Sequence, residues 1–168
     1  MTTVTVTSKE ANNILRKLYE EKSNFRNKEI DGMEFHAAVG ENVDDVRPDY
    51  NFEDTKSCIE IIDNQILAIK HAINLFNSSR IVGDTGLTID QVLIKLGMLT
   101  ERKQKFARMR SMQEKRRGQI TGNVIDYIYA NFDIEAADMA YEEADAELKH
   151  LQTALDLVNN TVTFEISY

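Results

Sequence analysis

The feature that most constrains the fold is an apolar repeat near the C-terminus. Its members alternate spacings of three and four residues over four successive heptads: Ile134, Ala137, Tyr141, Ala144, Leu148, Leu151, Leu155 and Val158. On a helix this spacing places all of them along one narrow stripe, and such a stripe is buried only when another helix lies along it. The repeat therefore predicts a long helix that begins after Asp133 and packs lengthwise against a second helix.

Two other segments carry the same spacing. Residues 55–77 are expected to form a helix with the stripe Ile59, Ile62, Ile66, Ile69, Ile73 and Phe76. A further helix should begin at Thr88, because Thr88 and Gln91 match a capping box. Its stripe runs through Ile89, Val92, Leu96, Leu99, Lys103, Phe106, Arg110 and Gln113. A short turn rich in Gly and Ser separates these two helices, so we expect them to form an antiparallel hairpin.

The remaining segments have different patterns. Residues 1–7 alternate Thr and Val and residues 161–168 alternate apolar and polar side chains, so we expect the two chain ends to pair as strands. Ser8 is a candidate N-cap for a helix that reaches about Phe25. The dense β-branched and aromatic run at 118–132 favours a strand or a buried crossover.

These patterns together predict a mainly all-α fold. We expect an antiparallel helical hairpin or bundle with coiled-coil-like stripes, plus a small β element from the termini or residues 118–132. With 168 residues the chain has the size of one domain. We therefore expect residues 1–168 to form a single helical domain, with an irregular acidic arm at about 26–54.

Composition indicates a protein of the cytoplasm. The single cysteine, Cys58, cannot form an internal disulfide, which fits a reducing compartment. The N-terminal residues include neither a basic leader nor an apolar core of the length that a signal peptide requires. No run approaches 18 uncharged apolar residues, so no transmembrane helix is expected.

Charge is distributed unevenly. The net charge of −8 argues against a general nucleic-acid binder. However, residues 101–117 carry eight basic side chains against Glu101 and Glu114, a local net charge of +6. Candidate anion-binding residues in this stretch are Arg102, Lys103, Arg108, Arg110, Lys115, Arg116 and Arg117. Either the stretch binds an anionic partner such as a nucleic acid, a nucleotide or a lipid surface, or it lies beside the acidic residues at 138–147.

No pattern in the chain points to catalysis. There is no phosphate-binding glycine loop, no dinucleotide fingerprint and no Gly-x-Ser-x-Gly elbow. Glu147-x-x-His150 matches half of a di-iron motif, but it occurs once and lies outside the apolar stripe. His36, in the acidic arm, has no second His or Cys at ligand spacing, so an enzyme built on it lacks the required constellation. We expect no catalytic residue, no metal and no cofactor.

Several motifs are similar to a known family. Ile73-Asn74-x-x-Asn77, Asp84-x-x-Leu87-Thr88 and Glu147-Leu148-x-x-Leu151-Gln152-x-x-Leu155-Asp156-x-x-Asn159-x-Thr161 resemble the septicolysin-like family of small bacterial helical proteins, over roughly residues 58–166. The resemblance implies an antiparallel helical hairpin with a further helix, a homo-oligomer and no established enzymatic activity. The threonine-rich N-terminal strand, the acidic arm and the 118–132 segment depart from the family pattern.

The leading hypothesis is a non-enzymatic helical-bundle protein that acts through self-assembly or protein–protein interaction. Part of the helical stripes stays uncovered in an isolated chain, so we expect a homo-oligomer. The residues expected to carry this core and its contacts are Ile66, Ile73, Leu96, Leu99, Tyr141, Leu148, Leu151 and Leu155. The alternative is a binding module for an anionic partner, which would use the basic stretch at 102–117.

Overall fold

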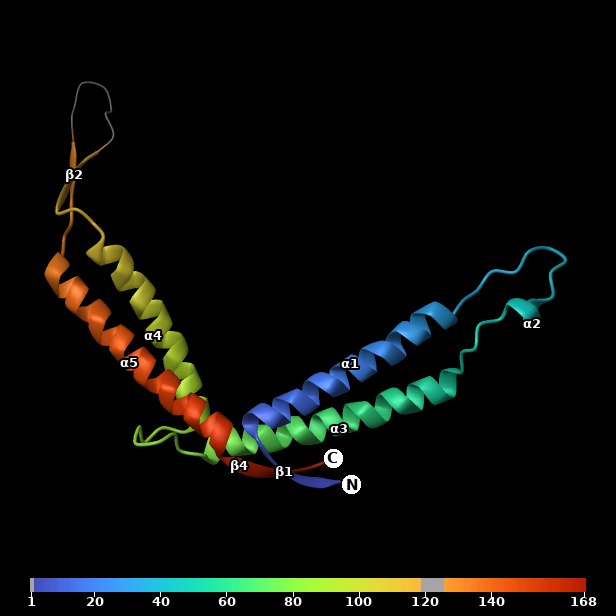
Figure 1. The fold of residues 1–168 in the computed structure, drawn as a ribbon. Helices are drawn as coiled ribbons and strands as arrows, with labels where there is room; N and C mark the ends of the chain where they lie inside the picture. The colour runs from blue at the N-terminus through green and yellow to red at the C-terminus, as the bar shows by residue number, and fades with distance from the viewer. Residues whose placement is uncertain (1, 119–125) are drawn as a thin grey trace. The chain divides into compact units, whose positions relative to one another are not determined.

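A computed structural model describes residues 2–118 and 126–168 (Figure 1). Its elements in chain order are β1 (Thr3–Thr7), α1 (Ser8–Gly32), α2 (Val43–Val46), α3 (Phe52–Ser79), α4 (Ile89–Arg110), β2 (Lys115–Arg117), β3 (Tyr127–Tyr129), α5 (Ile134–Thr161) and β4 (Thr163–Ser167). Most described residues are helical, and the named strands form two small antiparallel sheets, β1 with β4 and β2 with β3. The predicted mainly α fold with a small β element is confirmed.

The chain divides into two compact units. Unit 1 comprises Met1–Phe76 and Asn159–Tyr168, and unit 2 comprises Asn77–Val158. Each unit contains one pair of long helices and one of the small sheets. The expected single domain over residues 1–168 therefore consists of two units.

In unit 1, α1 and α3 lie side by side and run in opposite directions (Figure 1). Thr7, one residue before the predicted Ser8, is the N-cap of α1. Its backbone N–H donates to Glu10 Oε2 at 2.8 Å, and the Glu10 N–H donates to Thr7 Oγ1 at 3.3 Å. This reciprocal capping box satisfies two backbone donors that the first turn leaves unpaired. The helix continues past Phe25 to Gly32, so residues 26–32 belong to α1 and the prediction that the arm begins at 26 is wrong.

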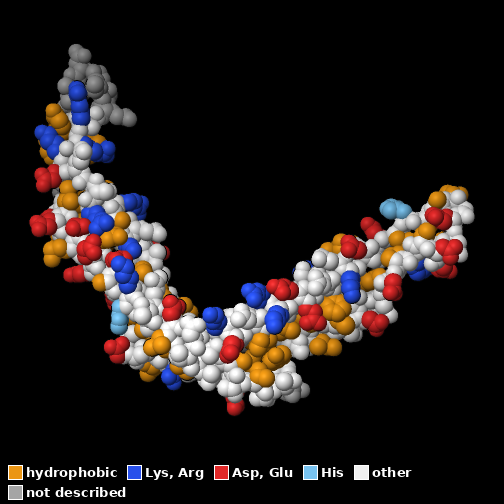
Figure 2. All heavy atoms as spheres, viewed as in Figure 1, with side chains coloured by type: hydrophobic (Ala, Val, Ile, Leu, Met, Phe, Trp, Pro, Cys, Tyr) orange, Lys and Arg blue, Asp and Glu red, His pale blue; other side chains and the backbone are white. Residues whose placement is uncertain are grey.

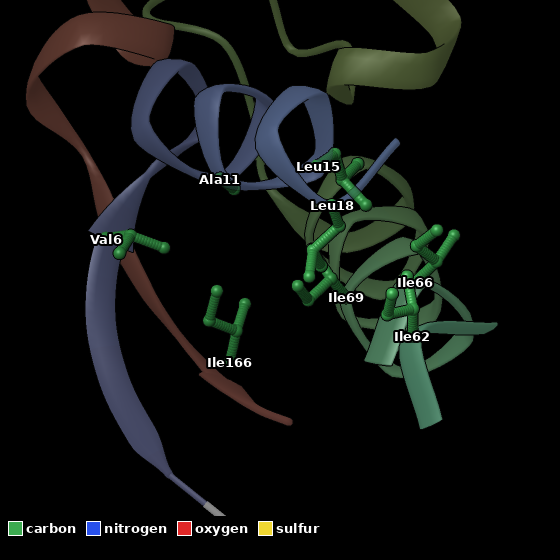
Figure 3. Packing of buried hydrophobic residues seen from close by; sticks show 8 residues of the cluster. All are labelled: Val6, Ala11, Leu15, Leu18, Ile62, Ile66, Ile69 and Ile166. Carbon is green, nitrogen blue, oxygen red and sulfur yellow. The ribbon is translucent and has the colours of Figure 1, made fainter. Parts of the chain in front are cut away.

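The core of unit 1 lies between these helices and the terminal sheet (Figure 3). It consists of Val6, Ala11, Leu15, Leu18, Ile62, Ile66, Ile69 and Ile166, and Ile73 packs against it while half-buried. The sheet register places Val4 opposite Ile166 and Val6 opposite Phe164, which confirms the predicted pairing of the chain ends. The alternation of Val and Thr therefore turns one face of β1 toward the helices.

The segment between α1 and α3 is held by local contacts. Asn42 caps the short helix α2 by accepting from the Asp44 N–H at 3.3 Å. Tyr50 lies against Gly32, where an added Cβ would be 2.5 Å from the Tyr50 Cβ. The Arg47 guanidinium lies 5.6 Å from the centre of the Phe35 ring. These contacts shape the segment, although most of its residues are exposed.

In unit 2, α4 and α5 form a second antiparallel pair (Figure 1). The predicted stripe of α5 is buried at Ala137, Ala144, Leu148, Leu151, Leu155 and Val158 and half-buried at Ile134 and Tyr141. On α4, Ile89, Val92 and Leu99 are buried and Leu96 is half-buried. The predicted caps are also present, because the Thr88 N–H donates to Gln91 Oε1 at 3.0 Å and Asp133 Oδ1 accepts from the Glu135 N–H at 2.9 Å.

The helix at 55–77 was predicted to form an antiparallel hairpin with the helix that begins at Thr88, and this prediction is wrong. The stripe of α3 is covered by α1, whereas α4 packs on α5. Within the connecting turn, Val82 is fully buried and Gly83 and Gly86 adopt positive φ, at 51° and 68°. Such φ values are accessible to glycine at little cost. The turn is thus part of the interior of unit 2 and does more than reverse the chain.

The 118–132 segment was expected to form a strand or a buried crossover. Its strand is confirmed as β3, which pairs with β2 in the register Lys115↔Tyr129, Arg116↔Ile128 and Arg117↔Tyr127. All six residues of the two strands are exposed, so the buried alternative is wrong for Tyr127–Tyr129. β3 stays exposed because its partner strand β2 consists of three adjacent cations, which cannot be taken out of water without counter-charges. Residues 119–125 fall outside the described residues.

Candidate interaction surfaces

Two of the predicted anion-binding residues, Lys103 and Arg110, face α5. Lys103 Nζ lies 2.5 Å from Asp145 Oδ1. Arg110 Nη1 donates to Asp138 Oδ1 at 3.0 Å and to Glu142 Oε1 at 3.1 Å. Both cations occupy stripe positions of α4, so the stripe ends in ion pairs instead of aliphatic contacts. For these two residues the structure agrees with the interpretation that the basic helix end lies beside the acidic stretch.

Asp145 is the most enclosed charge among these groups, with a side chain only 11% exposed. Hydrogen bonds from Lys103 and then from Lys149, whose Nζ lies 2.6 Å from Asp145 Oδ2, hold the pKa of Asp145 below its usual value. The same contacts raise the pKa of both lysines. A carboxylate with two cationic donors stays ionised at neutral pH, and these donors offset the cost of removing it from water.

Tyr141, predicted as a stripe residue, lies where the contacts along the stripe of α5 change from aliphatic to ionic. The Arg110 guanidinium lies over its ring at 3.6 Å from the ring centre, and Lys103 Nζ lies at 5.7 Å. Cations over an aromatic face are attracted by the ring quadrupole. Leu148, Leu151 and Leu155 therefore form the aliphatic part of the α4/α5 contact, and Tyr141 belongs to its ionic part.

The other predicted cations are Arg102, Arg108, Lys115, Arg116 and Arg117, and within the described ranges none of them forms an ion pair. Three of these make up β2, opposite the exposed strand Tyr127-Ile128-Tyr129. We call these six residues the basic hairpin. Lysine and arginine side chains gather around it in the space-filling view (Figure 2).

The ladder divides the basic hairpin into two faces. Directly paired residues of an antiparallel sheet share a face. Lys115, Arg117, Tyr127 and Tyr129 therefore lie on one face, and Lys115 Nζ is 4.0 Å from the centre of the Tyr127 ring. Arg116 and Ile128 lie on the other face, and both line a hollow of about 520 Å³ together with Met112 and Tyr129. Sequence reasoning missed this pairing because three-residue strands have too few positions to show a period.

A groove on one face of the α4/α5 pair was also not predicted. It consists of two adjoining hollows, of about 310 and about 360 Å³, that share Leu99 and Arg102. The remaining lining residues are Leu87, Gln91, Ile94, Lys95 and Met98 in the first hollow, and Lys105, Phe106, Ala140, Glu143, Ala144 and Glu147 in the second. Ile94 and Met98 lie off the heptad stripe, which is why the repeat gave no sign of them. The groove has an apolar floor and a charged rim.

The structure places the candidate ligand residues apart. Among the described residues, no three His, Cys, Asp or Glu side chains lie close enough together to hold a metal ion. His36 is exposed, and His150 Nε2 lies 3.8 Å from Asp84. Glu147, the other member of the half motif, instead pairs with Lys95 at 2.5 Å. None of the helices in the described part of the chain is long and apolar enough to cross a membrane.

Comparison with known proteins informs on the fold alone. No family model and no curated protein matches the chain. A crystal structure of a functionally unknown conserved protein from Corynebacterium diphtheriae is similar, with a TM-score of 0.64 and 15% sequence identity. The match covers 96% of this chain and 99% of that protein. The arrangement of elements is therefore shared with a natural protein of nearly the same extent.

Proposed function

We propose that this protein is a non-enzymatic interaction protein of the cytoplasm that works by assembling with further copies of itself. The observation that carries the proposal is the apolar groove on the α4/α5 face. Two helices can cover only one stripe of each other, and a face outside that stripe can pack against a further layer.

The apolar side chains in the groove are contiguous. Single exposed apolar residues are common on protein surfaces and need no explanation. Ile94 and Met98, however, lie one helical turn apart, are 60% and 55% exposed, and adjoin the hollow lined by Phe106 and Ala144. A helix of a second copy laid along this groove would remove these side chains from water, which is favourable by about 25 cal/mol for each Å² of apolar surface buried.

The rim of the groove favours a second copy as the occupant. Beside the ion pair of Lys95 with Glu147, the rim carries the cations Arg102 and Lys105 and the anion Glu143. In a two-fold contact the same patch is used by both partners, so a rim that contains both signs can be self-complementary. The resemblance to the septicolysin-like family supports the same proposal, since that family is expected to form homo-oligomers without enzymatic activity.

The test is the mass of the protein in solution. At about 500 mM salt, which screens contacts between exposed charges, light scattering and sedimentation velocity at micromolar concentration should give a mass above that of one chain. Under the same conditions Ile94→Glu with Met98→Glu should reduce the mass to that of a monomer, because a carboxylate cannot be buried unpaired in an apolar contact. Met139→Glu is the matched control, since Met139 is 62% exposed on α5 and does not line the groove. A monomeric parent protein would refute the proposal.

A second candidate function is binding of an anionic partner through the basic hairpin. It is favoured by the cations of β2, which lack ion pairs among the described residues, and by the exposed tyrosines beside them. Phosphate binding by such a surface would weaken steeply as salt is added. Replacement of Arg116 and Arg117 by alanine should then abolish retention of the partner, and the fold should be unchanged.

A further inference from the structure

The cations of the basic hairpin have no counter-charge among the residues that the structure describes. Lys115, Arg116 and Arg117 are adjacent, exposed and without an ion pair among the described residues. The nearest acids in the sequence, Glu114 and Asp126, flank the two strands, and within the described part of the chain neither forms an ion pair with the cations of β2. Exposed apolar and aromatic surface lies beside this charge, because Tyr127, Ile128 and Tyr129 are 51%, 43% and 61% exposed. A partner that is both acidic and apolar would complement this surface.

The chain itself contains a segment with that composition. We call residues 33–54 the acidic arm. It carries seven carboxylates against one arginine, namely Glu34, Glu41, Asp44, Asp45, Asp49, Glu53, Asp54 and the cation Arg47. Only Asp44 among these acids forms an ion pair within the described residues, with Arg47 at 3.4 Å. Acidic and hydrophobic side chains lie together over this segment around α2 (Figure 2).

The acidic arm also exposes apolar side chains. Phe35, Val43 and Phe52 are 36%, 46% and 55% exposed, and Val39 is fully exposed. The arm therefore matches the basic hairpin in both respects, with carboxylates for its cations and apolar groups for Tyr127, Ile128 and Tyr129. Opposite charges steer such surfaces together, and burial of the apolar groups between them adds to the affinity.

We infer that the basic hairpin of one copy binds the acidic arm of a second copy, so that copies join head to tail. The inference rests on the proposed function, since it specifies a further surface for self-association. A nucleic acid is disfavoured as the occupant because the whole chain carries a net charge of −8 and would repel a polyanion.

This contact joins two different surfaces, which has a consequence for the assembly. Each complex keeps one free hairpin and one free arm, so growth continues until a ring closes or a filament forms. The charges are exposed, and salt screens exposed charges beyond about 10 Å at 0.1 M ionic strength. Association through this contact should therefore exceed a dimer at low salt and be lost at high salt.

The experiment uses the full chain in the Ile94→Glu/Met98→Glu background, in which the groove is disabled. Association that remains in this background comes from another surface, so failure of the groove proposal and failure of the head-to-tail contact are distinguished. The hairpin variant adds Arg116→Ala and Arg117→Ala, and the arm variant adds Asp45→Lys and Asp49→Lys. Lys9→Ala with Lys17→Ala is the control, because it changes the net charge as the hairpin variant does but lies on α1.

Sedimentation velocity should show concentration-dependent growth of the background protein at about 20 mM salt and its loss at about 500 mM. The hairpin variant and the arm variant should each be monomeric alone, and the control should associate like the background. An equimolar mixture of the two variants should form a complex of two chains that grows no further, because only one productive contact is available.

Three results would overturn the inference. The first is a mixture that stays monomeric, because each variant still holds the surface that the other lacks. The second is association of either variant alone to the extent of the background protein. The third is a hairpin variant that associates normally but no longer retains a labelled single-stranded oligonucleotide that the background protein binds. That result would identify a nucleic acid as the partner of the basic hairpin.

Discussion

Replacement of Ile62 by alanine should destabilise unit 1 strongly, whereas the same replacement at the adjacent Ile61 should have almost no effect. Both residues are isoleucines of α3, and they differ only in the face of the helix that they occupy. Ile62 is 4% exposed and belongs to the core cluster with Leu15 and Ile66, whereas Ile61 is 60% exposed (Figure 3). The pair therefore isolates the contribution of the helical stripe.

The magnitude follows from the atoms removed. Isoleucine to alanine deletes three carbon groups, which corresponds to about 2.4 kcal/mol of transfer free energy at about 0.8 kcal/mol per buried CH₂. The cavity left at Ile62 adds to this, within the range of about 2–5 kcal/mol that such core truncations cost. At Ile61 the small transfer term is opposed by the higher helix propensity of alanine, so the change should stay within about 0.5 kcal/mol.

Urea unfolding followed by circular dichroism, with both variants at the same protein concentration, measures the difference. For an m-value of about 2 kcal/mol per M, the midpoint of Ile62→Ala should fall by about 1 M or more, and that of Ile61→Ala should match the parent protein. Equal losses at the two positions would show that the stripe of α3 is not the buried face, and the packing described for unit 1 would be wrong.

Three further outcomes are expected. Asp145→Asn should lower the free energy of unfolding at pH 7, and this loss should become smaller below about pH 4. The reason is that a carboxylate whose pKa is depressed by Lys103 stabilises the fold above its unfolded pKa, and this contribution is lost as the pH falls through the folded pKa. Urea midpoints of the variant and the parent protein at both pH values measure the difference. Gly97→Ala should raise the free energy of unfolding by about 0.5–1 kcal/mol, since a Cβ there meets nothing within 4 Å in the interior of α4. Gly32→Ala should instead lower the melting temperature, since its Cβ would lie 2.5 Å from the Tyr50 Cβ; a gain in stability there would contradict this packing.

The positions of the long helices could be predicted from local chemistry, and the main error in these predictions concerns the end of α1. The caps at Thr88 and Asp133 place backbone acceptors and donors within four residues of each other, so sequence reasoning could identify them. Sequence reasoning ended α1 too early, at Phe25, which is the last apolar residue on the side of the helix that carries the buried Ala11 and Leu15. In the structure Lys22 reaches Asp63 on α3, and α1 continues to Gly32.

The candidate surfaces were less accessible to sequence reasoning. Composition alone revealed the basic stretch, but it did not reveal that its cations fall into two groups. Lys103 and Arg110 form ion pairs within unit 2, whereas Arg116 and Arg117 stay exposed. This division depends on which helix face each cation occupies and on where α4 ends, at Arg110. The aromatic partner strand of the basic hairpin is separated from β2 in the sequence, and no local pattern joins them.

The sequence alone determined which face of each long helix is buried, because a spacing of three and four residues has one geometric meaning on a helix. It did not determine which stripe covers which. The hydrophobic effect is non-directional, so the isoleucines of α3 gain as much from the leucines of α1 as from those of α4. The tertiary structure decided between them through features that the repeats do not contain. In unit 1 these are the pairing of β1 with β4, which brings the chain ends to α1, and the contact of Lys22 with Asp63.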